Sequence, residues 1–259
     1  MASTDAVLLL SHGSRDPRAA HTVAGLVGAV AERTDCEVYA THLGFTAPTP
    51  DVALRRLADD GFRAVRIVPL LFIPGYHLTH DVPLAVELSA VSSRMHVSVA
   101  PPLVAGQGGQ RELLLMALAD RLFQAGADGY VDGLVLASAG SSSKRARLCL
   151  EGLARDLERS QGVPVELAFA SASTPSPTQA LKALSDKRVR KPAVASLFVT
   201  SGRLSDSVIA ACPDLPVAQP LGASPAFVEL LVAQAKTPPA YSWSDFAPVE
   251  TRSLVRGRA

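Results

Sequence analysis

The sequence predicts an α/β protein made of two similar domains, each a parallel four-stranded sheet flanked by helices. Short apolar runs alternate with amphipathic stretches in the first half of the chain, which is typical of parallel strands joined by crossover helices. The same order of runs begins again after about residue 130. A repeated order of this kind indicates that the two domains arose by internal duplication.

Each expected strand is an apolar run, and each expected helix places its apolar residues at helical spacing. In the first half we expect strands over 6–10, 37–43, 64–72 and 95–100, and helices over 17–33, 50–60, 82–93 and 110–125. In the second half we expect strands over 133–137, 164–170, 192–198 and 215–219.

Three landmarks align the two halves without a gap, because the residue numbers differ by 127 in every pair: Gly13 and Gly140, Pro48 and Pro175, and Gly75 and Gly202. The stretch 126–131 contains two glycines and an aspartate, which favour a boundary there. We therefore expect one domain over 1–128 and a second, degenerate domain over 129–237. From 238 to 259 the periodicity is lost, which predicts a C-terminal tail.

Composition excludes several classes of function. The net charge is +1 and the isoelectric point is about 7.8, so no strong field is available to attract nucleic acid or a membrane surface. The sequence MASTD lacks the pattern of a signal peptide, and no apolar run approaches the roughly 18 residues of a spanning helix. We therefore expect a cytoplasmic protein. The three cysteines, Cys36, Cys149 and Cys212, are too far apart for a metal or redox motif and are interpreted as small apolar residues.

All six histidines lie in the first half. His12 follows the first expected strand and His77 the third, whereas their counterparts in the second half are Ala139 and Leu204. In the common strand order 2-1-3-4, strands 1 and 3 are neighbours and a crevice opens at their carboxyl ends. We therefore expect both imidazoles to line one site in the first domain.

Two imidazoles without a cluster of carboxylates suit a borderline divalent metal such as Fe, Co, Ni or Zn better than Mg or Ca. Two protein ligands also leave positions open for a substrate. Because the unperturbed pKa of imidazole is about 6.5, either ring can accept a proton near neutral pH. His21 and His96, in contrast, are interpreted as ordinary hydrogen-bonded residues.

Two motifs carry a family resemblance. LLLSHGSRDPRA at 8–19, together with PLLFIPGYHLTHDVP at 69–83, resembles the sirohydrochlorin chelatase family in its long two-domain form, over about residues 5–236. The family includes the iron-inserting enzymes of sirohaem biosynthesis and the cobalt-inserting CbiX enzymes of cobalamin biosynthesis. The resemblance implies a lyase of the type II chelatases, which inserts a divalent metal into the tetrapyrrole sirohydrochlorin without a nucleotide.

The resemblance also implies roles for individual residues. His12 and His77 match the pair that binds the metal and accepts protons. We expect the substrate carboxylates to contact Gly13, Ser14, Arg15 and His80, with Arg203, Lys144 or Arg145 added from the second half. The alternative is that Ser14 caps a helix and that Arg15 and Arg18 are solvated. Asp81 and Pro83 are expected to cap and begin the third helix.

The metal is the finer question. Fe2+ is favoured because the histidine-rich or cysteine-rich tails of some cobalt-inserting relatives are absent; Co2+ and Ni2+ are the alternatives. No cofactor is expected beyond this substrate metal. The partners expected are the metal and sirohydrochlorin, with no nucleic acid and no membrane, and the protein is expected to be a monomer or a homodimer.

The sequence departs from the family near the end of strand 2, where many relatives have a glutamate. Residues 42–46 contain no acid. His42 is a candidate replacement, although a histidine in a strand can equally face the helices. The PLGxHP pattern that follows strand 4 in relatives is also lost.

Other functions fit less well. A histidine phosphatase would have arginine before His12, where this chain has Ser11, and a serine hydrolase would have GxSxG around Ser14. A protein that binds the metal or the tetrapyrrole without turnover remains an alternative. The basic run DKRVRK at 186–191 precedes a strand, so we expect it to be a solvated face at the amino ends of the strands.

Overall fold

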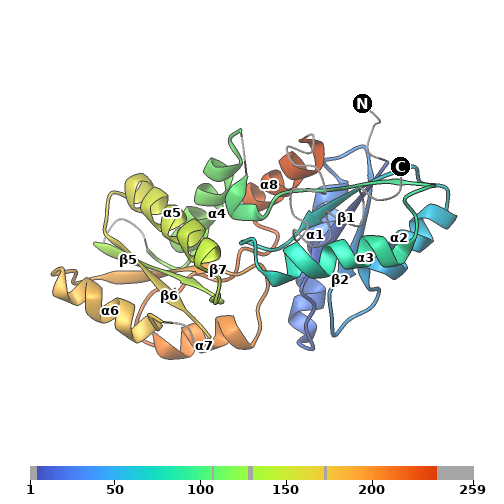
Figure 1. The fold of residues 1–259 in the computed structure, drawn as a ribbon. Coiled ribbons are helices and arrows are strands. Elements are labelled where there is room, and N and C mark those ends of the chain that lie inside the picture. The colour runs from blue at the N-terminus through green and yellow to red at the C-terminus, as the bar shows by residue number, and fades with distance from the viewer. Residues whose placement is uncertain (1–4, 107, 128–130, 172–173, 238–259) are drawn as a thin grey trace. The chain divides into compact units, whose positions relative to one another are not determined.

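The computed structural model describes residues 5–106, 108–127, 131–171 and 174–237. The chain divides into two compact units (Figure 1). Among the described residues, the first unit comprises 5–15, 23–106 and 231–237, and the second comprises the remainder. The predicted tail, 238–259, lies outside the described residues.

The first unit contains a parallel sheet whose described strands have the order β2-β1-β3-β4, as predicted. These strands are β1 (Ala6–Ser11), β2 (Glu37–His42), β3 (Ala64–Pro69) and β4 (His96–Val99). Strand β3 ends before the predicted residue 72. Beyond Pro69, the carbonyls of Leu71 and Phe72 accept hydrogen bonds from a short 3-10 turn at Leu103–Ala105 rather than from a strand.

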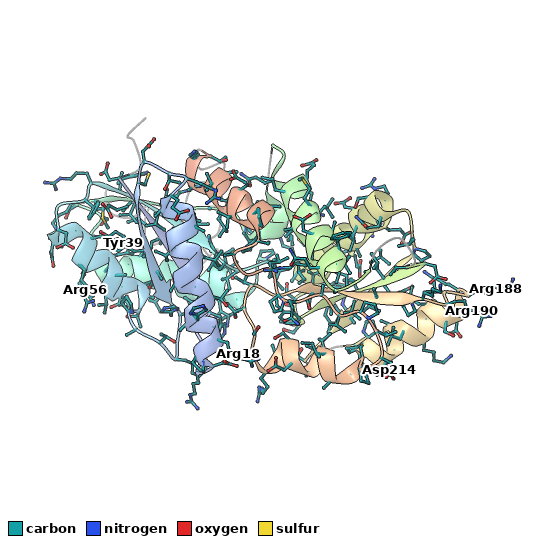
Figure 2. All side chains as sticks on the ribbon, turned by 180° about the vertical axis from the view of Figure 1, so that it is seen from behind. Arg18, Tyr39, Arg56, Arg188, Arg190 and Asp214 are labelled. Carbon is teal, nitrogen blue, oxygen red and sulfur yellow. The ribbon has the colours of Figure 1, made fainter. Side chains whose placement is uncertain are left out.

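Both faces of this sheet are covered by helices, which is why the strands are apolar on both sides. Leu8, Leu10 and Ile67 pack against α2 (Pro50–Asp59) and α3 (Val82–Ser89) in one apolar core. Figures 1 and 2 view the molecule from opposite sides and show α3 over one face and α1 (Pro17–Ala31) over the other. The arrangement leaves the carboxyl ends of β1 and β3 side by side.

Helix α3 begins at Val82, as predicted, but ends four residues before the predicted residue 93. A π-helical turn, His77–Asp81, precedes it, and the helix ends at Ser89 because Ala90 adopts a left-handed conformation with φ of 52°. Single π-helical turns are rare and are often found at functional sites.

The second unit repeats the plan with one strand fewer. Its described strands, β5 (Gly133–Ser138), β6 (Val165–Phe169) and β7 (Pro192–Leu197), are parallel in the order β6-β5-β7. The prediction of a fourth strand at 215–219 is wrong for the described structure, because only an isolated bridge joins Val217 to Val194. Pro216 and Pro220 flank this bridge and have no N–H to extend a ladder.

The remaining helices are α4 (Gln110–Gln124), α5 (Lys144–Gln161), α6 (Pro177–Asp186), α7 (Arg203–Ala211) and α8 (Pro225–Lys236). Helix α4 belongs to the second unit, where it packs on β7, although the predicted boundary at 128 assigned it to the first domain. The end of α8 belongs to the first unit, where Lys236 donates a hydrogen bond to the carbonyl of Arg33. The compact units therefore differ from the predicted domains at residues 16–22, at α4 and at the end of α8.

The backbone hydrogen bonds support the duplication. The N–H groups of His42, Leu43 and Gly44 donate to the carbonyls of Pro48, Ser11 and His12. The same three bonds occur 127 residues later, from Phe169, Ala170 and Ser171 to Pro175, Ser138 and Ala139. The two halves thus share their local geometry at the end of strand 2 as well as their strand order.

The basic run at 186–191 lies at the amino ends of the strands, as predicted. The backbone N–H groups of Arg190 and Lys191 donate to the carboxylate of Asp132, which directly precedes β5. Figure 2 shows Arg188 and Arg190 directed away from the sheet of the second unit. None of the described helices combines the length and the apolarity that crossing a lipid bilayer requires.

Candidate metal-binding site

The structure brings the two predicted histidines together in the first unit. His12 directly follows β1, and His77 begins the π-helical turn that follows β3. Their Nε2 atoms are 3.1 Å apart, and the ring centroids lie 4.6 Å apart with the planes at 84°. The pair therefore occupies the carboxyl edge of the sheet at the point that its strand order selects.

The other ring nitrogens are held by hydrogen-bond acceptors. Nδ1 of His77 donates to Oδ2 of Asp81 at 2.5 Å, and Nδ1 of His12 lies 3.4 Å from the carbonyl oxygen of Gly13. We assign the ring proton to Nδ1 in both residues, because a carboxylate and a carbonyl can only accept. With this assignment both Nε2 atoms offer lone pairs to one cation, and without a cation the 3.1 Å contact between them requires a proton on one of the two nitrogens.

The separation suits two ligands of one metal ion. Nitrogens 3.1 Å apart, each about 2.1 Å from an ion, subtend an angle of about 95° at that ion. This angle corresponds to neighbouring coordination positions and leaves the others open to a substrate. Within the described residues, no group of three or more His, Cys, Asp and Glu side chains is arranged to hold a metal.

Asp81 has a different role from the predicted one. It stands at the N-cap position of α3, but its side chain makes no capping hydrogen bond. Instead its two carboxylate oxygens face Nδ1 of His77, at 2.5 Å, and Nδ1 of His80, at 3.5 Å. A carboxylate hydrogen-bonded to the far nitrogen of a metal-binding imidazole fixes the orientation of the ring. Spacing alone offered this signal, since residues four apart share a helical face.

The loop that carries His12 is packed against the loop that follows β2. Gly13 has φ of +84°, and a Cβ placed on it would lie 1.8 Å from the carbonyl oxygen of Gly44. Gly44 in turn donates its N–H to the carbonyl of His12 at 3.1 Å, and Thr46 donates its hydroxyl to the carbonyl of Ser14. Glycine at position 13 is therefore required both by its conformation and by this close approach.

His42 is a buried partner of Ser11. Its side chain is 8% exposed, and burial lowers its pKa from the ordinary value. The Ser11 hydroxyl forms a hydrogen bond of 2.7 Å with Nδ1 of His42 and accepts the N–H of Gly13 at 3.2 Å. Through Ser11, His42 thus stabilises the loop that carries His12 and Gly13. The member of the 42–46 stretch whose ring stacks near His12 is Phe45, with centroids 6.2 Å apart.

The side chains predicted to bind substrate carboxylates are divided between the two units. Arg15 is exposed, with its guanidinium carbon 5.2 Å from the centroid of the Phe45 ring, and His80 stacks on Tyr76 at 4.7 Å. Arg203 is exposed as the first residue of α7 in the second unit, where Lys144 and Arg145 begin α5.

Arg18 was expected to be solvated in the alternative interpretation. Instead its guanidinium forms ion pairs with the carboxylates of Asp16 and Asp206, each at 2.6 Å. The sequence predicted that His12 and His77 would lie together, but it carries no separate signal for the aromatic rings near them, Phe45 and Tyr76.

The two parallel sheets flanked by helices define an α/β fold that is shared with solved chelatase structures. The chain is similar to solved structures of SirB from Bacillus subtilis with Fe3+ (20% identity, 94% of this chain and 99% of that chain, TM-score 0.77). It is also similar to CbiX, described as the terminal enzyme for biosynthesis of siroheme in denitrifying bacteria (20% identity, 91% and 99% of the two chains, TM-score 0.63). At these identities the likeness concerns the fold.

The CbiX family model matches residues 6–125 and 133–237, and the chain belongs to the CbiX family. The predicted family is thereby confirmed. A sirohydrochlorin ferrochelatase from Priestia megaterium is 26% identical over 178 residues, which are 67% of this chain and 64% of that protein. A sirohydrochlorin cobaltochelatase from Methanothermobacter thermautotrophicus is 29% identical over 77 residues, 30% of this chain and 54% of that protein. The chain thus spans less than two thirds of the length of these curated relatives.

Proposed function

We propose that this protein is a sirohydrochlorin chelatase, a lyase-class enzyme that inserts a divalent metal ion into sirohydrochlorin without a nucleotide. The observation that carries the proposal is the pair of Nε2 atoms of His12 and His77, 3.1 Å apart at the carboxyl edge of the sheet. The choice of sirohydrochlorin as the substrate rests on the family and on the names of its relatives.

The chemistry requires both a metal site and a base. The divalent ion replaces two pyrrole N–H protons, so the products are the metal complex and two protons, with no change in oxidation state. His12 and His77 hold the ion through Nε2 while the macrocycle approaches the open positions. As the ion transfers to the pyrrole nitrogens, each released imidazole becomes free to accept a proton at Nε2.

Asp81 supports this proton transfer. A protonated His77 carries a positive charge, and the carboxylate 2.5 Å from its Nδ1 stabilises that charge. Asp81 also keeps Nε2 directed toward His12, so the ring returns to the orientation needed for the next ion. Phe45 stands near His12 where many relatives have a glutamate, so no acid from that loop is available to accept a proton. We therefore assign proton transfer to His12 and to His77 with its partner Asp81.

We propose Fe2+ as the metal, which would make sirohaem the product. The ferrochelatase relative aligns over 67% of this chain and the cobaltochelatase relative over 30%, and the tail sequence lacks histidine-rich and cysteine-rich motifs. Imidazole ligands discriminate weakly among late divalent ions, so Co2+ and Ni2+ enter the test as competitors.

A second candidate is a protein that binds the metal or the tetrapyrrole without turnover. The observation in its favour is that Phe45, and not an acid, stands next to His12. Loss of a general base typically lowers a rate by about 10²–10⁴ while leaving binding intact.

The test is the anaerobic absorbance change of sirohydrochlorin with Fe2+, Co2+ or Ni2+, comparing wild type with His12→Ala and His77→Ala. We expect acceleration by wild type and its loss in both variants. His96→Ala, which changes an exposed histidine on β4, is the matched control and should retain the activity. Binding of metal and tetrapyrrole without acceleration over the uncatalysed rate would establish the second candidate instead.

A further inference from the structure

A row of aromatic rings runs through the imidazole pair in the first unit. Phe45 stacks on His12 with centroids 6.2 Å apart and planes at 27°. His12 meets His77 edge to face, and His77 meets Tyr76 in the same way at 6.2 Å. One large ring therefore flanks the metal-binding pair on each side.

Both flanking rings are turned toward solvent. Phe45 is 64% exposed and Tyr76 is 65% exposed. Single exposed apolar side chains are common on protein surfaces, but here two aromatic rings border one candidate site. Phe45 in particular has no polar group that would explain its position in water.

The backbone holds Phe45 in place at a conformational cost. Its φ is +62°, in the left-handed region that side chains other than glycine rarely adopt. The bonds from Gly44 N–H to the His12 carbonyl and from the Thr46 hydroxyl to the Ser14 carbonyl tie both of its neighbours to the His12 loop. Strain of this kind, kept beside a candidate site, is a reason to look for a function of the side chain.

The charge around the row matches a flat ligand with an acidic rim. The guanidinium of Arg15 lies over the Phe45 ring, 5.2 Å from its centroid, and is itself exposed. At the other end His80 stacks on Tyr76 with planes at 16°. Apolar surface thus lies next to the candidate metal-binding pair, with the guanidinium of Arg15 at one end and the imidazole of His80, which faces Asp81, at the other.

We propose that Phe45 and Tyr76 bind the flat face of the tetrapyrrole, one on each side of the ion held by His12 and His77, and that Arg15 receives a carboxylate at the rim. This inference rests on the proposed function and adds the residues that would orient the macrocycle. Conjugated rings stack favourably on aromatic side chains, and the contact removes apolar surface of both partners from water.

The test measures two affinities separately. The first is the dissociation constant of metal-free sirohydrochlorin, from its fluorescence under anaerobic conditions. The second is the dissociation constant of Co2+, from calorimetry. We expect Phe45→Ala to weaken tetrapyrrole binding about tenfold, as truncation of a stacking ring does in other sites, and to leave Co2+ binding unchanged.

Further variants separate the ring from its surroundings. Tyr76→Ala should behave like Phe45→Ala, whereas Tyr76→Phe keeps the ring and should bind as wild type does. Leu88→Ala removes an equally exposed apolar side chain on α3 and should leave both affinities unchanged. Phe45→Gly should weaken tetrapyrrole binding while leaving Tm unchanged or raised, because glycine tolerates the left-handed conformation.

The outcomes are distinguishable. If wild type binds no sirohydrochlorin, the proposed function fails and this inference fails with it. If wild type binds and Phe45→Ala and Tyr76→Ala bind equally well, only the inference is overturned. A large fall in Tm for Phe45→Gly would also overturn it, because the ring would then be a part of the fold and not a surface kept for the ligand.

Discussion

Replacing Gly13 by alanine tests the packing that positions His12. The added Cβ would lie 1.8 Å from the carbonyl oxygen of Gly44, whereas real Cβ contacts are essentially never shorter than 3.0 Å. The two loops must therefore separate by at least the difference, 1.2 Å. The bond from Gly44 N–H to the His12 carbonyl, now 3.1 Å, would then be lost.

The expected cost has two parts. A left-handed conformation costs alanine about 1–2 kcal/mol, and the lost hydrogen bond costs about 1 kcal/mol. We therefore expect Gly13→Ala to lower the free energy of unfolding by about 2–3 kcal/mol. The same movement displaces His12 from His77, so the affinity for Co2+ should fall as well.

Gly61→Ala is the matched control. Gly61 also has positive φ, +93°, but a Cβ there would have no heavy atom within 4 Å. It should cost only the conformational part and leave Co2+ binding unchanged. The assay compares urea midpoints followed by circular dichroism, together with Co2+ titration of each variant. Equal midpoints and equal Co2+ affinities for the two variants would refute the steric argument.

Three further predictions concern other buried or charged groups. Asp81→Asn should lower the rate of metal insertion about 10–100-fold in the absorbance assay without unfolding the protein, because the charge behind His77 is lost; an unchanged rate and pH profile would contradict this role. Burial lowers the pKa of His42 in the folded protein. Below about pH 6.5 the unfolded chain therefore binds a proton at this residue that the folded chain does not, and the free energy of unfolding decreases as the pH is lowered. His42→Phe, which introduces the residue found at the equivalent place in the second half, should lose less Tm between pH 7 and pH 5 than wild type; equal losses would refute the assignment. Arg66 is 1% exposed, its Nη atoms have no partner among the described residues, and burial lowers its pKa to about 10. Arg66→Met should therefore leave the urea midpoint unchanged or raise it, and a clear fall would show that the guanidinium stabilises the fold.

Much of the fold followed from the sequence. Alternating apolar and amphipathic segments predict parallel strands with crossover helices, and the repeat at 127 residues predicts two copies of one plan. The confirmed strand order places the ends of strands 1 and 3 together, so the sequence predicts that His12 and His77 lie close to each other. Topology suffices here because neighbouring parallel strands present their carboxyl ends at one edge.

Other features depend on contacts that periodicity does not describe. The apolar face of a helix reveals that it packs on a sheet but not on which one, and α4 in fact packs on β7 in the other half. Likewise, an apolar segment between Pro216 and Pro220 predicts a strand, yet only one bridge forms. Both outcomes depend on which surfaces meet after the chain has folded.

The details of the candidate site were decided in the same way. The sequence alone determined which residue types stand at the strand ends and which half of the chain carries the imidazoles. Only the tertiary structure showed that Asp81 turns to His77, that His42 turns inward to Ser11, and that Phe45 lies beside His12. The direction of a loop side chain depends on the backbone conformation and on the hydrogen bonds available around it, and both are set by segments that are distant in the sequence.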